Sequence, residues 1–280
     1  MRAAASCLAF VLAAVAAPAA AVDAIVATST NGLLRFDTGT PGVATVLTIS
    51  GIGAGDAIVG MDVRPIDRQV YLVTRNPSGA GRLYRLNPDT GIAVQLSTLT
   101  ADPADVTAPY TQLTGLRYGV DFNPVADRLR LVGDTRQNLR VNPANGLVTT
   151  DSDLNPGVPV VVASGYTESY AGAALTTLYG IDVVSDTLYF QNPPNNGTLV
   201  PVGVLGGAAG DVIDTATLDI GDAPARNSAF AVLTSNDTAR VYAINLSTGA
   251  ATPTGGLAGN PVVSGFAILD PGVVFRNGFE

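Results

Sequence analysis

The stretch Leu83-Tyr84-Arg85-Leu86-Asn87-Pro88-Asp89-Thr90-Gly91 contains the pattern that decides the fold. It is a short apolar and aromatic segment followed by Asn and a few turn residues that end in Gly. The pattern occurs five times, at spacings of 49, 55, 51 and 52 residues, and closes on Gly42, Gly91, Gly146, Gly197 and Gly249. A period of about 50 residues with several strands in each repeat is typical of a β-propeller.

The residues of each repeat have a mechanical explanation. Asn or Asp starts a side-chain-capped turn, Pro fixes φ, and Gly supplies a positive φ before the next strand. Functional residues on a repeated fold are carried by individual loops. We therefore attribute the repeated Asn-Pro and Thr-Gly residues to turn formation and look for chemistry elsewhere.

Placed in register, the repeats predict an all-β protein with five four-stranded blades. The segment 265–269 resembles an inner strand without a blade. A blade without an inner strand precedes it in the chain, at residues 23–29, 33–37 and 43–49. Joining the two would close the ring and remove an open sheet edge. A sixth blade is the alternative, if the segment 166–186 divides differently.

The first 21 residues predict a signal peptide. Arg2 supplies the positive region, residues 7–17 are apolar, and the run that ends at Ala21 consists of small residues suited to a peptidase. We expect a single propeller domain over residues 22–270 and a tail over 271–280. The mature protein would be periplasmic or extracellular, monomeric and without membrane insertion.

Composition removes most of the usual catalytic groups. The chain has no His and no Lys, its 15 basic residues are all Arg, and its single Cys lies in the predicted signal peptide. A His-based triad, a Cys nucleophile, a Schiff-base Lys and a Cys/His zinc site are therefore excluded. The net charge of −8 disfavours nucleic acid as a partner. These facts favour a non-enzymatic module that needs no cofactor and binds a small polar ligand, a glycan or a protein.

Aspartate is the main reactive group that remains. The predicted inner strands carry Asp62, Asp121 and Asp219 at equivalent places, and Asp182 stands near the corresponding rim of blade four. Inward carboxylates could hold a cation at the axis, or serve as the acid–base groups of a hydrolase or lyase acting on a glycan. The alternative is structural: each carboxylate accepts backbone N–H bonds from a loop at the channel mouth, which lowers its pKa.

A second candidate site lies in the phrase that runs from Gly119 to Arg140. Along residues 128–132, period-two geometry points two leucines one way and Arg128 and Arg130 the other. Asp121, Asp127 and Asp134 are close enough in sequence to pair with them. We predict a ligand cluster for a carboxylate or sugar at the central channel, formed by Asp121, Arg128, Arg130, Asp134, Asn138 and Arg140. A salt-bridge network between blades is the alternative.

The third candidate is a calcium loop at Asp151, Asp153 and Asn155, which have the D-x-D-x-N spacing of oxygen ligands. The loop departs from the calcium-binding pattern, since Pro156 stands where Gly is expected and Val162 where an acid is expected. An Asp-rich turn is the alternative to a calcium site.

The phrase Gly119-Val120-Asp121-Phe122-Asn123-Pro124-Val125-Ala126-Asp127-Arg128-Leu129-Arg130, followed by Gln137-Asn138-Leu139-Arg140, resembles a bacterial family of exported proteins known as domain of unknown function 4394. The hallmark of that family is G-x-D-F-N-P-x-x-D-R-L-R followed by Q-N-L-R-x-N-P. Residues 176–182 and 195–199 also match. The resemblance implies a propeller-like fold and brings no assigned activity or catalytic residues.

Overall fold

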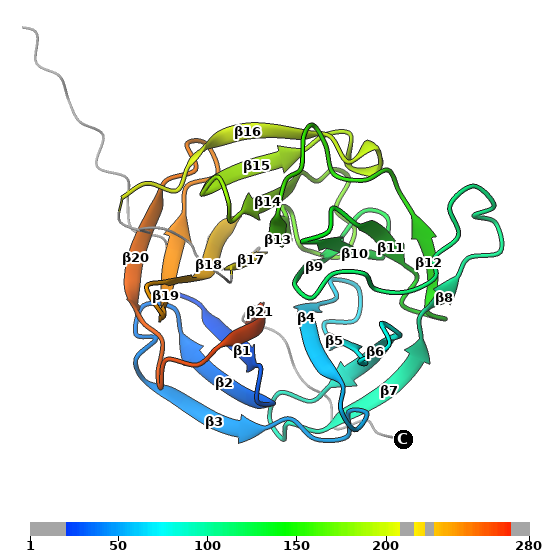
Figure 1. The fold of residues 1–280 in the computed structure, drawn as a ribbon. Coiled ribbons are helices and arrows are strands. Elements are labelled where there is room, and N and C mark those ends of the chain that lie inside the picture. Colours follow the sequence, from blue (N-terminus) through cyan, green and yellow to red (C-terminus); the bar gives the residue numbers. More distant parts are fainter. Residues whose placement is uncertain (1–20, 208–215, 222–226, 270–280) are drawn as a thin grey trace, which may run out of the picture.

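The computed structural model describes residues 21–207, 216–221 and 227–269. They form five β-sheets around a central axis, as the blades of a propeller (Figure 1). In each sheet consecutive strands pair antiparallel, and the innermost strand of one blade lies beside that of the next. The predicted all-β, five-bladed propeller is confirmed, and the six-bladed alternative is wrong.

The strands follow one another outward from the axis in every blade. Blade one consists of β21 (Val263–Leu269), β1 (Asp23–Thr28), β2 (Gly32–Asp37) and β3 (Ala44–Thr48). Blade two consists of β4 (Ala57–Val63), β5 (Val70–Arg75), β6 (Gly81–Leu86) and β7 (Ala93–Thr98). Blade three consists of β9 (Tyr118–Asn123), β10 (Arg128–Gly133), β11 (Asn138–Val141) and β12 (Leu147–Thr150).

The last two blades complete the ring. Blade four consists of β13 (Val161–Tyr166), β14 (Leu178–Asp182), β15 (Thr187–Gln191) and β16 (Leu199–Val204), with a short 3-10 turn at Pro194–Asn196. Blade five consists of β17 (Ala216–Gly221), β18 (Ser228–Ser235), β19 (Thr238–Ile244) and β20 (Ala251–Gly256). Blade three also has a fifth strand, β8 (Thr100–Ala101), which pairs parallel with β12.

The two ends of the domain meet in blade one, as the sequence predicts. Strand β21, the last along the chain, pairs antiparallel with β1, the first, so that Val26 lies opposite Phe266. The pairing satisfies the edge that each strand would otherwise expose. The ring is therefore closed by main-chain hydrogen bonds between the beginning and the end of the domain.

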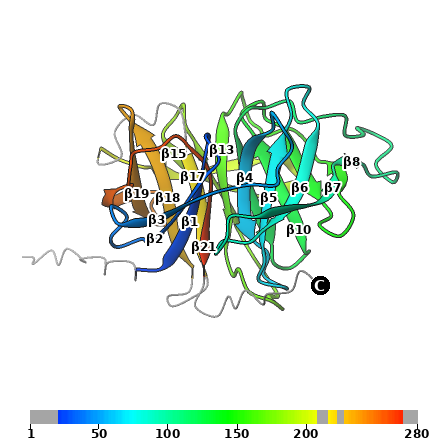
Figure 2. The ribbon, with the colours of Figure 1, turned by 90° about the horizontal axis from the view of Figure 1, so that it is seen from below.

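Small residues let the inner strands approach one another closely. Figure 2 shows these strands from the side, running through the thickness of the ring. A Cβ at Gly119 would clash with the backbone of Ser164 on β13, and a Cβ at Gly60 would clash with the side chain of Val120 on β9. Glycine at these positions is therefore required by the narrow axis.

The apolar core is divided among the five clefts between blades, and the cleft between blades three and four differs from the others. The four other clefts each hold 13 to 15 buried apolar residues. The cleft between blades three and four holds four, namely Val132, Leu154, Val161 and Leu199. Its remaining space is taken up by polar side chains, which makes it a candidate site.

Two predictions fall on residues outside the described chain. The signal peptide lies there except for Ala21, and so does the tail over residues 271–280. Both stay predictions. Within the described residues, no helix has the length and apolar character needed to cross a membrane.

Candidate functional site

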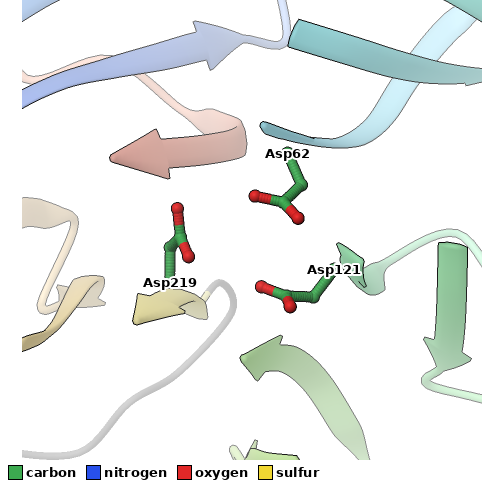
Figure 3. Close-up of side chains that lie close together, drawn as sticks. All are labelled: Asp62, Asp121 and Asp219. Carbon is green, nitrogen blue, oxygen red and sulfur yellow. The ribbon is translucent and has the colours of Figure 1, made fainter. Parts of the chain in front are cut away.

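Three buried carboxylates meet on the axis of the propeller. Asp62 comes from β4, Asp121 from β9 and Asp219 from β17, and their side chains converge (Figure 3). One carboxylate oxygen from each lies within 4.8 Å of those of the other two. All three residues are at most 4 % exposed. The structure thus brings together three of the four aspartates that the sequence proposes as inward or catalytic carboxylates.

These three side chains hold one backbone N–H from each of the five inner strands. Asp62 accepts hydrogen bonds from Phe122 in the next blade at 2.7 Å and from its own neighbour Val63 at 2.6 Å. Asp219 does the same with Ile268 of the next blade and its own neighbour Ile220, both at 2.6 Å.

The third carboxylate, Asp121, accepts a bond from the N–H of Tyr166 in the next blade at 2.9 Å. The inner-strand position that Asp121 occupies in blade three is occupied by Gly165 in blade four and by Ala267 in blade one. Neither of these residues has a carboxylate. Blade five follows blade four, and blade two follows blade one. In these two blades Asp219 and Asp62 accept the N–H of their own inner strand, since the preceding blade has no carboxylate to accept it. Three carboxylates therefore satisfy all five positions of the ring.

The pKa of Asp121 is raised well above its usual range. Burial is the largest cause, the negative charges of Asp62 and Asp219 follow, and the N–H of Tyr166 acts in the opposite direction. The structural alternative in the sequence analysis predicted that each of these aspartates accepts N–H bonds from a loop and that its pKa is thereby lowered. For Asp121 both expectations are wrong, because the donor lies on an inner strand and burial among like charges outweighs one hydrogen bond.

Asp182 does not join this group. It ends β14, and its carboxylate accepts hydrogen bonds from the backbone N–H groups of Val160, Val184 and Ser185 at 2.8 to 3.0 Å. It caps a turn in blade four, one strand away from the inner strand. The prediction that Asp182 stands near the rim of the inward carboxylates is therefore wrong, because it ends the second strand of the blade and its oxygens are taken up by the turn.

A polar network fills the cleft between blades three and four, and Arg130 is its centre. This residue is 2 % exposed, yet its guanidinium has four partners. It donates to Asp151 at 2.6 Å and to Asn138 at 2.7 Å in blade three. It also donates to Tyr166 at 3.2 Å and to Asn195 at 2.7 Å, both in blade four. Arg130 therefore joins the two blades through neutral partners in blade four, whereas its ion pair with Asp151 lies within blade three and is not the predicted salt bridge between blades.

The charges in this cleft are not balanced. Arg140 donates to both oxygens of Asp151 at 2.8 Å, so Arg130 and Arg140 share a single carboxylate. The hydrogen bond to Asp151 is the largest of the causes that raise the pKa of Arg140. Arg128 donates to the backbone carbonyl of Asp127 at 2.9 Å and forms no ion pair with a described residue. Three guanidinium groups thus stand near the carboxylate of Asp151, and Asp105 is a second negative charge close enough to raise the pKa of Arg140.

The three arginines line an open cavity of about 460 Å³, which we name the arginine pocket. Its wall is completed by seven neutral residues, Asn123, Ala126, Tyr166, Pro193, Pro194, Asn195 and Asn196. None of the described residues that line it is acidic. The pocket lies in the cleft between blades three and four and not at the central channel, which corrects the predicted location.

The remaining predicted ligand residues lie outside the lining of the pocket. Asn138 is buried behind it and supports Arg130, while Asp121 faces the axis. Asp134 accepts a bond from the N–H of Leu116 and lies 3.4 Å from Arg117. The expected pairing of Asp121, Asp127 and Asp134 with Arg128 and Arg130 is therefore wrong. Asp127 binds Arg64 of blade two.

The predicted calcium ligands are placed around an arginine pair. Both oxygens of Asp151 are hydrogen-bonded by Arg140. The side chain of Asp153 is 60 % exposed and lies 3.4 Å from Arg136. Asn155 donates through its Nδ2 to the backbone carbonyls of Asp153 and Asn196. The calcium loop stays a prediction, with arginine as a competitor for its first ligand.

The sequence did not identify Tyr166, Asn195 and Asn196 as parts of the pocket. Tyr166 was assigned to an inner strand, and the two asparagines to a turn that ends at Gly197. The turn does form, but it also reaches over the cleft, and Asn195 accepts a bond from Arg130. The sequence carried no separate signal for this second role, because the run from Pro193 to Gly197 is accounted for by the 3-10 turn and its caps.

Comparisons with solved structures find likenesses of low similarity. A protein of unknown function from Bacteroides thetaiotaomicron is 13 % identical, with a TM-score of 0.47, over 84 % of this chain and 58 % of its own. A protein from Lactobacillus plantarum is 12 % identical, with a TM-score of 0.43, over 90 % and 100 %. An auxiliary nutrient binding protein from Bacteroides thetaiotaomicron is 12 % identical, with a TM-score of 0.43, over 74 % and 55 %. These likenesses assign no activity.

A comparison with curated protein sequences finds no match. A family model, in contrast, matches residues 32–267, which include most of the described ring and both candidate sites. This span contains the Gly119 to Arg140 phrase and the strands that carry the three axial carboxylates. The chain belongs to the family described as Domain of unknown function (DUF4394).

Proposed function

We propose that this propeller is an exported, non-enzymatic binding module that takes a small anionic ligand in the arginine pocket. The observation that carries the proposal is the charge of that pocket: its described lining contains three arginines and no acid, in a chain of net charge −8. Guanidinium groups bind carboxylates and phosphates through paired, charge-assisted hydrogen bonds.

The geometry around Arg128 supports this proposal. Arg130 and Arg140 are held in place by Asp151 and by the residues of blade four, so they present fixed positive charge. Arg128 is tied only to main-chain carbonyl oxygen, so its charge is available to a ligand. The amide side chains of Asn195 and Asn196 and the hydroxyl of Tyr166 add hydrogen-bonding groups suited to a hydroxylated anion such as a sugar acid.

The hydrolase alternative has less support from the geometry. The carboxylates of Asp62, Asp121 and Asp219 are buried and are occupied by backbone N–H groups. Glycoside hydrolysis uses two carboxylates about 5–9.5 Å apart on either side of an accessible bond. The three axial carboxylates offer no such accessible pair.

Calorimetric titration of the purified protein tests the proposal. The probes are D-glucuronate, D-gluconate and inorganic phosphate, with D-glucose as the uncharged comparison. We expect at least one anion to bind and glucose not to bind. In Arg128→Gln the affinity should fall by about 10- to 100-fold, because a hydrogen bond to a charged group contributes about 1.5–3 kcal/mol.

Two controls make the outcome decisive. Arg240, which is exposed on β19 in blade five, provides the matched substitution Arg240→Gln, and its affinity should equal that of the wild type. Equal weakening in both variants, or no binding of any anion at millimolar concentration, would refute the proposed site. Recovery of a chemically altered ligand would refute the non-enzymatic part.

A further inference from the structure

A second cavity, of about 220 Å³, opens on the axis at the face where the inner strands begin. Every blade contributes to its wall, through residues such as Val59, Tyr118, Val162, Thr217 and Val263. The arginine pocket is reached from the opposite face, where β9 ends at Asn123 and β13 ends at Tyr166. The cavity, which we name the channel mouth, is therefore a separate site.

The wall of the channel mouth is mainly apolar. Val59, Val162 and Val263 lie along it, and two large apolar side chains are exposed at its rim, Leu116 at 71 % and Val262 at 61 %. Removal of such surfaces from water favours binding of a hydrocarbon group. The wall thus selects a ligand with an apolar part.

The inner end of the channel mouth, where the cavity narrows along the axis, is polar, and two hydroxyl groups there have no hydrogen-bond partner. A narrower axial cavity continues from it, with Thr217 in the wall of both and Ser164 in the wall of the narrower one. The Oγ of Ser164 and the Oγ1 of Thr217 are buried and have no hydrogen-bond partner. A buried polar group left without a partner costs about 1–3 kcal/mol. The two hydroxyls are therefore positioned to bind the polar end of a ligand.

Further along the axis, beyond these two hydroxyls as seen from the mouth, the charge is negative. Gly60, Gly119 and Thr217 line the narrower cavity, and each stands two residues before Asp62, Asp121 or Asp219 on the same strand. Two residues of a strand span about 7 Å, so the axial carboxylates form the next layer along the axis. Among the described residues that line the mouth, Arg117 is the one cation, and it lies 3.4 Å from Asp134.

We propose that the channel mouth binds a small organic ammonium ion. Its hydrocarbon part packs against Val59, Val162 and Val263. Its ammonium group donates hydrogen bonds to the hydroxyls of Thr217 and Ser164 and is attracted by the carboxylates below. This site is independent of the arginine pocket, since it has a different ligand charge and lies on the other face.

The test compares n-hexylammonium with three partial analogues in calorimetric titrations. Ammonium chloride has the charged group without the chain, hexanol has the chain without the charge, and hexanoate has the opposite charge. We expect hexylammonium to bind at least about tenfold more tightly than each analogue. Hexanol and hexanoate lack the charged hydrogen bond, which contributes about 1.5–3 kcal/mol, and ammonium lacks the buried chain, which contributes about 0.8 kcal/mol per CH₂. Hexanoate binding as tightly as hexylammonium would overturn the proposal.

Substitution of one hydroxyl locates the site. Thr217→Val keeps the shape and removes Oγ1, so hexylammonium affinity should fall about tenfold while the melting temperature does not fall, since that oxygen has no partner in the free protein. Thr150→Val is the matched control, because the Oγ1 of Thr150 is also buried without a partner but lies at the end of β12 in blade three. Equal affinity in Thr217→Val and Thr150→Val would refute the assignment.

Discussion

The carboxylate of Asp121 accepts a hydrogen bond of 2.9 Å from the backbone N–H of Tyr166, so a side chain of blade three holds the inner strand of blade four. Asp62 and Asp219 make the same connection to their next blades. The contacts are made at the axis, where all five blades converge, so they tie the strands together at the point of closest approach.

Asp121 should make the stability of the protein depend on pH. Its pKa in the folded protein is raised above that in the unfolded chain, so folding takes up a proton. The resulting stabilisation is complete at pH values below the pKa of Asp121 in the unfolded chain, and it is lost as the pH rises through the raised pKa in the folded protein. Between these two pKa values the free energy of unfolding falls by about 1.4 kcal/mol per pH unit. Urea unfolding at a series of pH values measures this slope.

The isosteric variant Asp121→Asn provides the control for that slope. The amide retains an oxygen for the N–H of Tyr166 but does not titrate. We expect its stability to decline less with rising pH than that of the wild type. Parallel stability curves for the two proteins would show that Asp121 does not carry the effect.

Alanine substitutions of the axial carboxylates should differ in their effect on stability. Asp219→Ala leaves the N–H groups of Ile220 and Ile268 without their acceptor, whereas Asp121→Ala leaves only that of Tyr166. Each unsatisfied buried donor costs about 1–3 kcal/mol. The free energy of unfolding should therefore fall further in Asp219→Ala, by about that amount, in urea titrations at one pH. A larger loss in Asp121→Ala would contradict the donor assignment.

Removal of β21 should prevent closure of the ring. A chain that stops after Val262 lacks the partner of β1 and leaves the inner edge of β1 open. We expect it to aggregate or to lose the β-sheet signal in circular dichroism, because open edges pair with other chains. A chain that stops after Leu269 retains β21 and should elute and unfold as the full-length protein does. Similar behaviour of the two truncations would contradict this account of closure.

Calcium at Asp151, Asp153 and Asn155 would have to compete with arginine. Arg140 bonds both oxygens of Asp151 and Arg130 bonds one of them, so Arg140→Gln should free Oδ1 while Oδ2 stays bonded to Arg130. The freed oxygen should increase the rise in melting temperature produced by millimolar calcium. Adding Asp153→Ala should abolish the rise. A melting temperature that calcium leaves unchanged in Arg140→Gln would remove the loop as a calcium site.

The blades could be derived from the sequence because their signals are local. Asn, Pro and Gly set each turn from within a few residues, and apolar alternation along a strand selects the face that is buried. Along β10, for example, Leu129 and Leu131 pack into the cleft toward blade two while Arg130 faces blade four. The closure of β21 on β1 followed in the same way, from two incomplete blades at the ends of the chain.

The partners of the polar side chains were decided only by the tertiary structure. Arg130 is bound by Asp151, 21 residues away, and by Asn195, 65 residues away. The nearer acids have other partners: Asp121 accepts the N–H of Tyr166, Asp127 pairs with Arg64 and Asp134 with Arg117. Likewise, Asp62 and Asp219 turn to their own strands because Gly165 and Ala267 stand in the preceding blades. These contacts depend on which residues face each other across a cleft once the ring has closed, and sequence periodicity does not encode that relationship.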